Sequence, residues 1–402
     1  MIELLVGMAI GLFLTATAIA FARYETKLLG VSTESLDVQR AGRLAIDLLA
    51  RDLKEAGAGV GYLDNGVFAG LKVERFTWTS LNPAATLAFN STGTPLPENP
   101  GFPPPQGAGV DIPLNTSDGT VYTVRSTDLM ILRAGGSYAT IADYTSAGPT
   151  GQICAGPDID FEPNELVVLR NEDGIAAHAF LLTGIGSPGA CTKGQCLNGC
   201  RTFTGISQSA FLETGPGASA LSYLSGEMHG GLEAIAWFVV PQALAIPGSG
   251  TDVDNIGVLR RATFDGNRGC NARDNTCGAA VSEYVETLQV QVWKWDSVAR
   301  TWSNAGQTPL DGRVRLRVDI ELVTRNRTPN SEAGRSATTL ADARRFRAVR
   351  LRLAGGVCIP AVANCPAPPQ EPDLGDAYER EVYRTSVEIW NASYMTMGDR
   401  GQ

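Results

Sequence analysis

Histidine is scarce in this sequence: His178 and His229 are the only two among 402 residues. Histidine is the side chain that most often serves as a general acid or base. His178 falls in a predicted strand, where we expect a structural role. The sequence also lacks a phosphate-binding glycine loop and a dinucleotide fingerprint, and the segment 205–209 lacks the closing glycine of a nucleophile elbow. These absences argue against an enzyme.

Basic residues are also in deficit, with 33 Lys and Arg against 42 Asp and Glu, a net charge of -9. Binding to a phosphate backbone requires clustered Lys and Arg. A general nucleic-acid surface is therefore not expected, and a local basic patch remains open. The hydrophobic fraction of 44% excludes both a disordered chain and one that spans a membrane many times.

Charge is absent from Leu4 to Ala22. At about 1.5 Å per residue this run is roughly 28 Å long as a helix, close to the hydrocarbon thickness of a bilayer. The sequence therefore predicts a transmembrane segment over 1–22. The apolar side chains expected to line it, first against lipid and then in a protein core, are Leu4, Leu5, Val6, Met8, Ile10, Leu12, Phe13 and Leu14.

Glu3 stands at the start of this run, where burying an ionised carboxylate costs several kcal/mol unless a partner is present. No lysine or arginine precedes Arg23, which lies about 30 Å further along a helix. We therefore expect Glu3 to pair with the terminal amine of this or another subunit.

Helix breakers are missing as well, because no proline precedes Pro83 and no strong glycine cluster precedes Gly57. Within 23–56, charged residues recur every fourth position and leave an apolar opposite face. The charged ladder is Arg43, Asp47, Arg51 and Glu55, and the apolar face is Ala45, Leu49 and Leu53. The pattern predicts one helix over 1–56 whose amphipathic second part, 23–56, packs on a head formed by 57–402.

A cleaved secretory signal is the alternative interpretation of the apolar run, with Ala18-Ile19-Ala20 as a cleavage site. Such a signal has a basic region before its apolar core, which this sequence does not show. Cleavage there would also sever the run from the helix that continues it.

From Gly57 onward the composition shifts to glycine, proline and β-branched residues, which predicts short strands separated by turns. Proline-rich stretches at 82–120 and 359–376 are expected to be surface loops. The predicted strands cover 72–78, 120–125, 128–133, 166–170, 177–182, 233–240, 284–295, 313–323, 346–353 and 383–390. Because such strands would form antiparallel sheets against the helix, the predicted class is α+β.

All eight cysteines lie in glycine- and proline-rich segments beyond the apolar run, which fits disulfides in an oxidising compartment. The expected pairs are Cys270 with Cys277 and Cys358 with Cys365, each closing a short loop worth on the order of 2 to 3 kcal/mol in the chain-entropy model. The remaining four, Cys154, Cys191, Cys196 and Cys200, would form two further bridges whose pairing is open. Zinc is the alternative for this cluster, although its spacing is irregular for a tetrahedral site.

No cofactor is predicted, and calcium is the best of the weak metal candidates. Oxygen ligands alternate at Asp158, Asp160 and Glu162, and again at Asp252 and Asp254, which Asn255 follows directly. Neither segment continues into the twelve-residue loop with a central glycine and a closing glutamate. A solvated acidic turn is the interpretation that we favour for both.

The segment from Ile2 to Leu12 resembles the N-terminal signature of type IV pilins and of the pseudopilins of type II secretion, in which a glutamate follows the processing site. In that family a prepilin peptidase cleaves after a glycine and methylates the residue four positions before the glutamate. That position would fall upstream of Met1, so the resemblance implies processing that no residue of this sequence can be assigned to.

The segment Gln39 to Gly57, with Arg51-Asp52-Leu53 and Ala56-Gly57 at its end, resembles the PilW group of minor pilins. The resemblance continues weakly over segments of the head and implies a type IV pilin-like fold, with a long N-terminal helix packed on a mostly antiparallel head. It further implies a minor pilin that primes pilus assembly and occupies the tip, supporting adhesion, twitching motility and sometimes DNA uptake.

The partners implied by this resemblance are other minor and major pilins, an inner-membrane assembly platform, the prepilin peptidase and a tip adhesin. The implied location is the inner membrane with a periplasmic head, and then the extracellular pilus. Two alternatives remain. One is a pseudopilin of type II secretion, whose J-type members share the Arg-Asp-Leu segment. The other is a membrane-tethered extracytoplasmic binding protein that never polymerises.

Overall fold

The fold was analysed in a computed structural model. The residues that it describes are 2–60, 70–73, 77–78, 89–90, 110–115, 121–135, 138–147, 150–156, 161–170, 176–186, 200–207, 226–245, 253–265, 276–304, 315–326 and 380–389.

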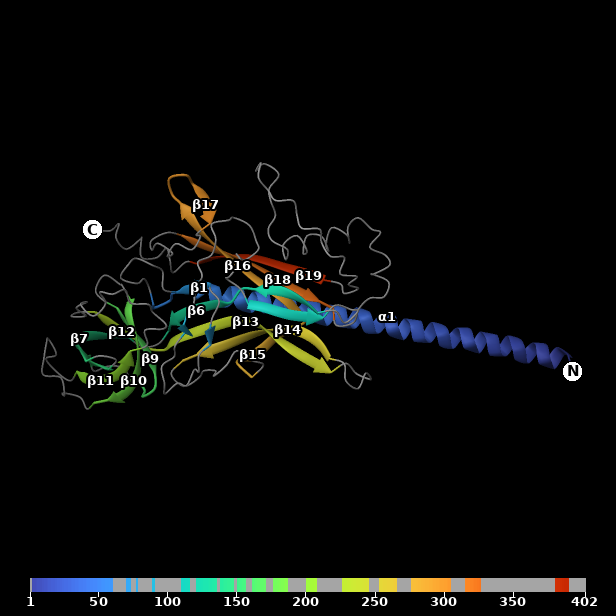
Figure 1. The fold of residues 1–402 in the computed structure, drawn as a ribbon, viewed down its shortest axis with the longest axis horizontal. Coiled ribbons are helices and arrows are strands. Elements are labelled where there is room, and N and C mark those ends of the chain that lie inside the picture. Colours follow the sequence, from blue (N-terminus) through green and yellow to red (C-terminus); the bar gives the residue numbers. More distant parts are fainter. Residues whose placement is uncertain are drawn as a thin grey trace.

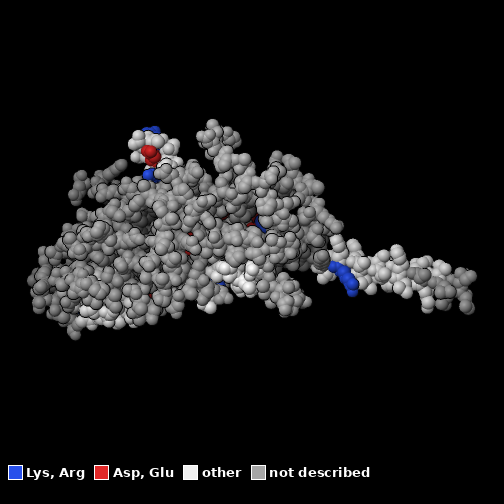
Figure 2. All heavy atoms as spheres, in the orientation of Figure 1, with Lys and Arg blue, Asp and Glu red and all other residues white. Residues whose placement is uncertain are grey.

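A single long helix, α1 (Ile2–Lys54), opens the chain. Its N-terminal part extends away from the head (Figure 1), and the described atoms of the outermost part belong to uncharged residues (Figure 2). The helix ends where Gly57 and Gly59 adopt positive φ angles of 76° and 67°, which glycine reaches without a Cβ clash. The chain then joins a sheet, because the Gly57 amide donates to the Leu132 carbonyl and the Ala134 amide donates to the Ala58 carbonyl.

The first sheet has five antiparallel strands in the order β1-β6-β13-β14-β15. Their bounds are β1 (Leu71–Val73), β6 (Leu129–Ala134), β13 (Leu232–Ala245), β14 (Val253–Phe264) and β15 (Ala279–Glu283). The long pair β13 and β14 runs in unbroken register from Ala234 opposite Phe264 to Ala245 opposite Val253.

A second sheet has four antiparallel strands in the order β17-β16-β18-β19. They are β16 (Val285–Asp296), β17 (Thr301–Asn304), β18 (Leu316–Arg325) and β19 (Arg380–Ile389). The two sheets are joined at a few points, such as the Thr127 amide, which donates to the Leu288 carbonyl at 2.8 Å.

Six further strands close into a barrel in the order β10-β11-β8-β7-β12-β9. They are β7 (Tyr138–Ala147), β8 (Thr150–Ala155), β9 (Leu166–Arg170), β10 (Ala176–Ile185), β11 (Arg201–Ser207) and β12 (Glu227–His229). Two small pairs complete the described strands: β2 (Thr77–Trp78) with β3 (Phe89–Asn90), and β4 (Val110–Asn115) with β5 (Val121–Ser126). Strands β3 and β4 lie within 82–120, which the proline content predicts as a loop.

The predicted α+β class is wrong. In the described residues one helix accompanies nineteen strands, and these form a closed barrel and several separate antiparallel sheets, so the protein is mostly β. The sequence patterns correctly predicted several strands, but they do not show which strands pair with one another. Barrel closure depends on contacts between strands far apart in the chain, which local periodicity cannot predict.

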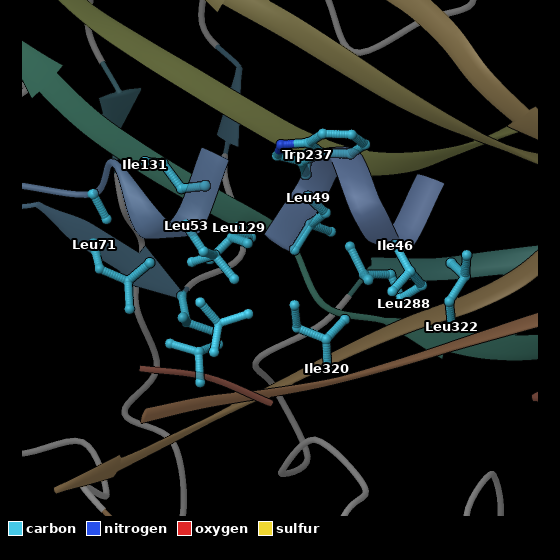
Figure 3. Packing of buried hydrophobic residues seen from close by; sticks show 14 of the residues in the cluster. Ile46, Leu49, Leu53, Leu71, Leu129, Ile131, Trp237, Leu288, Ile320 and Leu322 are labelled. Carbon is cyan, nitrogen blue, oxygen red and sulfur yellow. The ribbon is translucent and has the colours of Figure 1, made fainter. Parts of the chain in front are cut away.

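The second half of α1 lies between the two sheets. Ala45, Leu49 and Leu53, each four residues apart, are completely buried. They pack in one cluster with Trp237 of the first sheet and with Ile320 of the second (Figure 3). Burying one leucine of this kind contributes about 1.5 to 3 kcal/mol. The amphipathic face of the helix therefore supplies the centre of the largest core.

The first sheet is buried on both faces. Its opposite face carries Met130, Leu132 and Phe238, which pack with Val168 and Leu181 of the barrel strands. Burial on both faces explains why residues 235–240 are all apolar. In a strand with one solvent-exposed face, apolar and polar residues would alternate. A third cluster, including Phe161, Phe180 and Phe203, fills the barrel itself.

Candidate functional site

The exposed half of α1 is the most unusual surface among the described residues. Side chains that the sequence places in the apolar run are open to solvent, from 51% for Val6 to 72% for Leu12. Met8, Ile10, Phe13 and Leu14 lie in the same range. By length and composition the stretch Val6–Thr26 could cross a membrane. Glu3, Leu4 and Leu5 belong to α1, but their side chains lie outside the described part of the chain.

The polar groups of this stretch are compatible with an apolar environment. The Thr15 hydroxyl donates to the Gly11 carbonyl at 2.9 Å, and the Thr17 hydroxyl donates to the Leu14 carbonyl at 2.9 Å. A threonine whose hydroxyl bonds to its own helix leaves no unsatisfied donor facing lipid or another helix. These two hydroxyls therefore add little to the cost of burying the segment.

Asp52 joins α1 to the head. Its carboxylate accepts from Arg261 in a two-pronged ion pair, Nε to Oδ2 at 2.7 Å and Nη2 to Oδ1 at 3.0 Å. The indole Nε1 of the fully buried Trp237 donates to the same Oδ2 at 2.9 Å. The Asp52 side chain is only 8% exposed, and its bond raises the pKa of the Arg261 guanidinium. Asp52 therefore fixes the rotation of α1 about its own axis and its position along that axis relative to the first sheet.

The last turn of α1 is held by a second ion-pair group. Arg133 of β6 contacts the Glu55 carboxylate, and its Nη2 lies 2.8 Å from Glu233 Oε2 on β13. These three side chains line a pocket of about 440 Å³ together with Ala58 and Gly231. Because two carboxylates share one guanidinium there, the group ties the helix end to two neighbouring strands.

The last described strand, β19, contacts the second half of α1. Gln39 Nε2 donates to Glu381 Oε1 at 2.7 Å. The Tyr383 ring lies so close to Gly42 that a Cβ on Gly42 would overlap it. Burial, reinforced by the negative charge of Glu381, raises the pKa of the Tyr383 phenol. Gly42 therefore permits close approach of β19 to α1.

Sequence reasoning found the apolar face and the charged ladder of the helix but gave no role to Asp52. Arg43, Asp47 and Arg51 are exposed, as expected for a solvated ladder, whereas Glu55 pairs with Arg133. The available signal was an acidic residue beside Leu53 on the otherwise apolar face, where an unpaired carboxylate would be costly.

Three of the eight cysteines are described: Cys154, Cys200 and Cys277 are each disulfide-bonded, and no cysteine in the described part is free. The expected pairings stay predictions, because Cys191, Cys196, Cys270, Cys358 and Cys365 lie outside the described residues.

The calcium candidates are only partly described. Among the residues that the structure covers, no group of three or more His, Cys, Asp or Glu could hold a metal ion. Asp254 and Asn255 belong to β14, opposite Leu244 and Ala243, so this part of the predicted acidic turn is strand. The Glu162 amide donates to Glu165, while Asp158, Asp160 and Asp252 lie outside the described residues.

His178 lies in β10 opposite Leu169, as expected for a strand residue. His229 lies in β12, and its Nε2 is 2.8 Å from Glu227 Oε2. Burial lowers the pKa of His229, and the nearby Arg170 adds to this effect, although the bond to Glu227 opposes both. The folded protein therefore favours the neutral ring more than the unfolded chain does.

The lowered pKa of His229 makes the stability of the fold depend on pH. Because the unfolded chain binds a proton near pH 6.5 and the folded His229 binds it only at lower pH, stability is lost as the pH falls below about 6.5. We expect the urea midpoint to fall less between pH 7.5 and pH 5 in His229→Gln than in the unmodified protein. Parallel pH profiles for the two proteins would contradict this prediction.

Comparisons with known proteins add little. No protein-family model matches the sequence, and no curated protein does. Among solved structures, a type IV-like pilin from Thermus thermophilus is similar to this chain at 13% identity. The similarity covers 57% of this chain and 85% of that chain, with a TM-score of 0.18. At this score the likeness carries no argument about fold or function.

Proposed function

We propose that this chain is a minor pilin, which primes assembly of a type IV pilus and is incorporated into its tip complex. The main support for the proposal is that the two halves of α1 differ in their exposure to solvent. The half that includes Leu12 is exposed and apolar, whereas the half that includes Leu49 is buried between two sheets. A subunit that leaves a bilayer and enters a fibre needs both halves.

The exposed half can exchange lipid for protein neighbours at little hydrophobic cost, because both surroundings are apolar. In the proposed fibre the helices of neighbouring subunits replace the bilayer around Val6 to Thr26. The buried half keeps the head in a fixed position relative to this segment through Asp52. The head then faces outward, where it meets other pilins and a tip adhesin.

Glu3 supplies the register in this mechanism. Its carboxylate pairs with the terminal amine of a neighbouring subunit, a directional contact that a low dielectric strengthens. The proposed sequence of events is processing by a prepilin peptidase, insertion in the inner membrane with a periplasmic head, extraction at the assembly platform and export in the pilus. Adhesion and twitching motility would depend on the finished fibre.

The proposal is tested by Glu3→Ala. We expect loss of the chain from sheared surface fibres, with its amount in the membrane fraction unchanged, because the apolar run still inserts. Quantitative mass spectrometry of both fractions measures this, and the N-terminal peptide reports processing and methylation.

Asp37→Ala is the matched control, since Asp37 is an exposed acidic residue of the same helix and lies beyond the stretch Val6–Thr26. It should leave incorporation intact. Unchanged incorporation of Glu3→Ala would count against the mechanism, and recovery of an unprocessed chain only from membranes would favour a tethered binding protein.

A further inference from the structure

The barrel is inserted into the connection between two neighbouring strands of the first sheet. Strands β6 and β13 pair with each other, and Ala134 at the end of β6 lies opposite Leu232 at the start of β13. All six barrel strands lie between Tyr138 and His229, in the chain that joins β6 to β13. Tyr138 and His229 are also paired, so the two crossings begin and end side by side. We call the two crossings, 134–138 and 229–232, the neck.

The helix end, the first sheet and the barrel meet in one apolar cluster. Val168 and Leu181 of the barrel pack there with Met130 of the first sheet. Val60, which lies in the turn that follows α1 and is completely buried, belongs to the same cluster. The barrel lies at the end of the molecule away from the N-terminus (Figure 1), so this cluster is where the long helix reaches it.

The crossing into β13 is held by the barrel itself. Glu165 Oε1 accepts from the Gly231 amide at 2.7 Å, and Glu165 Oε2 accepts from the Glu162 amide at 3.0 Å. A Cβ on Gly230 would lie 2.5 Å from Glu165 Oε1 and 2.7 Å from the Phe161 ring. Gly231 adopts a φ of 63°, in the left-handed region. These two glycines therefore permit close packing and a turn, and Glu165 makes this crossing move with the barrel.

The crossing out of β6 is held by the turn that follows α1. The Ala134 amide donates to the Ala58 carbonyl at 2.7 Å, and a Cβ on Gly59 would overlap the Ala134 carbonyl oxygen. At the next residue, Gly135, an added Cβ would have no atom within 4 Å. Gly135 is exposed and lines the pocket of about 440 Å³ that Arg133 also borders. This crossing therefore has space to move, and its position depends on the end of α1.

Arg133 connects the neck to the helix end. It precedes Ala134 in β6, and it is paired in register with Glu233, which follows Leu232 in β13. Its Nε and Nη2 lie 3.1 Å and 2.8 Å from Glu233 Oε2. Its Nη1 contacts the carboxylate of Glu55, the residue directly after α1. One guanidinium therefore joins the helix end to the two strands from which the neck begins.

We propose that Arg133, Glu55 and Glu233 form an ionic clamp through which the end of α1 fixes the barrel on the head. When the clamp is closed, both crossings stay against the sheet. When it opens, the crossing at Gly135 moves and the barrel shifts relative to the sheet. The clamp thereby links the barrel to the helix that leaves the opposite end of the molecule (Figure 1). Such coupling needs an element with two arrangements that both sites bias, and the neck is that element. The inference does not depend on the proposed function.

Hydrogen exchange in the full-length chain, resolved at single amides and measured in detergent, tests the clamp. Arg133→Met removes the charge but keeps the apolar part of the side chain. We expect the Ala134 amide to exchange at least tenfold faster, because its bond to Ala58 opens when the helix end is released. The Gly231 amide should change less than twofold, because Glu165 holds it on the moving barrel.

Arg315→Met is the matched control, because Arg315 pairs with Glu388 of β19 at 2.8 Å, in the second sheet. It should leave exchange at the Ala134 amide unchanged.

Glu55→Gln tests the helix side of the clamp alone. We expect at least threefold faster exchange at the Ala134 amide, a smaller effect because Arg133 keeps its pair with Glu233. In a chain that already carries Arg133→Met, Glu55→Gln should have no further effect, since the contact is already lost. Asp47→Asn, which changes an exposed acid of the same helix outside the clamp, should leave this amide unchanged.

The movement of the barrel is measured between two spin labels. Unnatural amino acids carry them at Thr183 of the barrel and Ala280 of the first sheet, both exposed. Pulsed electron paramagnetic resonance gives the distribution of distances between the labels. We expect one narrow distribution in the unmodified chain and a broader one in Arg133→Met.

The inference is overturned if Arg133→Met leaves the Ala134 amide within twofold of the unmodified chain, or if the distance distribution stays narrow. It is also overturned if exchange rises equally at the buried Leu169 and Leu259, because Arg133 would then support the whole fold. If Arg133→Met does not fold, Glu55→Gln decides, since it leaves the pair between Arg133 and Glu233 intact. Recovery of the chain from fibres tests the proposed function separately, and none of these outcomes affects it.

Discussion

Replacing Asp52 by alanine is expected to lower the free energy of unfolding by about 3 kcal/mol, because a partly buried charge and a buried indole both lose their acceptor. Arg261 would keep its guanidinium charge, and its remaining hydrogen bond among the described residues would be to Thr263 Oγ1, at 3.2 Å. Trp237 Nε1 would be left inside the core without its bond to Asp52. Urea unfolding of the full chain in detergent, followed by tryptophan fluorescence, measures the loss.

Asp47→Ala is the control for this result, since Asp47 is exposed on the same helix. It should change stability by less than about 0.5 kcal/mol. Asp52→Asn separates charge from hydrogen bonding, because the amide oxygen can still accept from Trp237. A loss for Asp52→Ala no greater than that for Asp47→Ala would show that Asp52 does not secure the helix to the head.

Gly257→Ala is expected to destabilise the fold by about 3 kcal/mol, through a clash with backbone. A Cβ at this position would overlap the Val285 carbonyl oxygen and meet Val239 Cγ1 at 3.0 Å. Val285 begins β16 and Gly257 lies in β14, so the extra atom would push apart strands of the two sheets that enclose α1. Backbone cannot rotate away as a flexible side chain can, so the cost is at the upper end for overpacking.

The matched substitution is Gly156→Ala, where a new Cβ would have no atom within 4 Å. It should be neutral within about 0.5 kcal/mol. Thermal unfolding of both variants is the measurement. Similar midpoints for the two variants would mean that the sheets can separate at little cost.

Several strands were predictable because their apolar residues follow a local pattern. Residues 166–170 are the clearest case, since the predicted segment and β9 have the same bounds. Strand β13 continues to Ala245, beyond the predicted end at residue 240, because Pro241 falls where β13 pairs with β14 and no longer with β6. A proline is tolerated at a position with one unpaired edge.

The barrel was less predictable, and its strands β7, β8, β11 and β12 were missed. In β11 the residue Gly205 allows close approach, since a Cβ there would lie 2.9 Å from the Leu181 carbonyl oxygen. Glycine is a turn signal in sequence, so a strand that needs it for packing is interpreted as a loop. Asp52 was missed for a related reason, because its partners Arg261 and Trp237 are about two hundred positions away in the chain.

The contact between Gln39 and Glu381 joins residues 342 positions apart, which determines when the head can be completed during synthesis. At about 5 to 20 residues per second, roughly 20 to 70 seconds separate the translation of these two residues. During that interval the apolar run can already enter the membrane, while the edge of β18 that pairs with β19 still lacks its partner strand. Chaperone demand should therefore be greatest just before the last strand leaves the ribosome, and a chain that stops short of β19 should be a substrate for proteolysis.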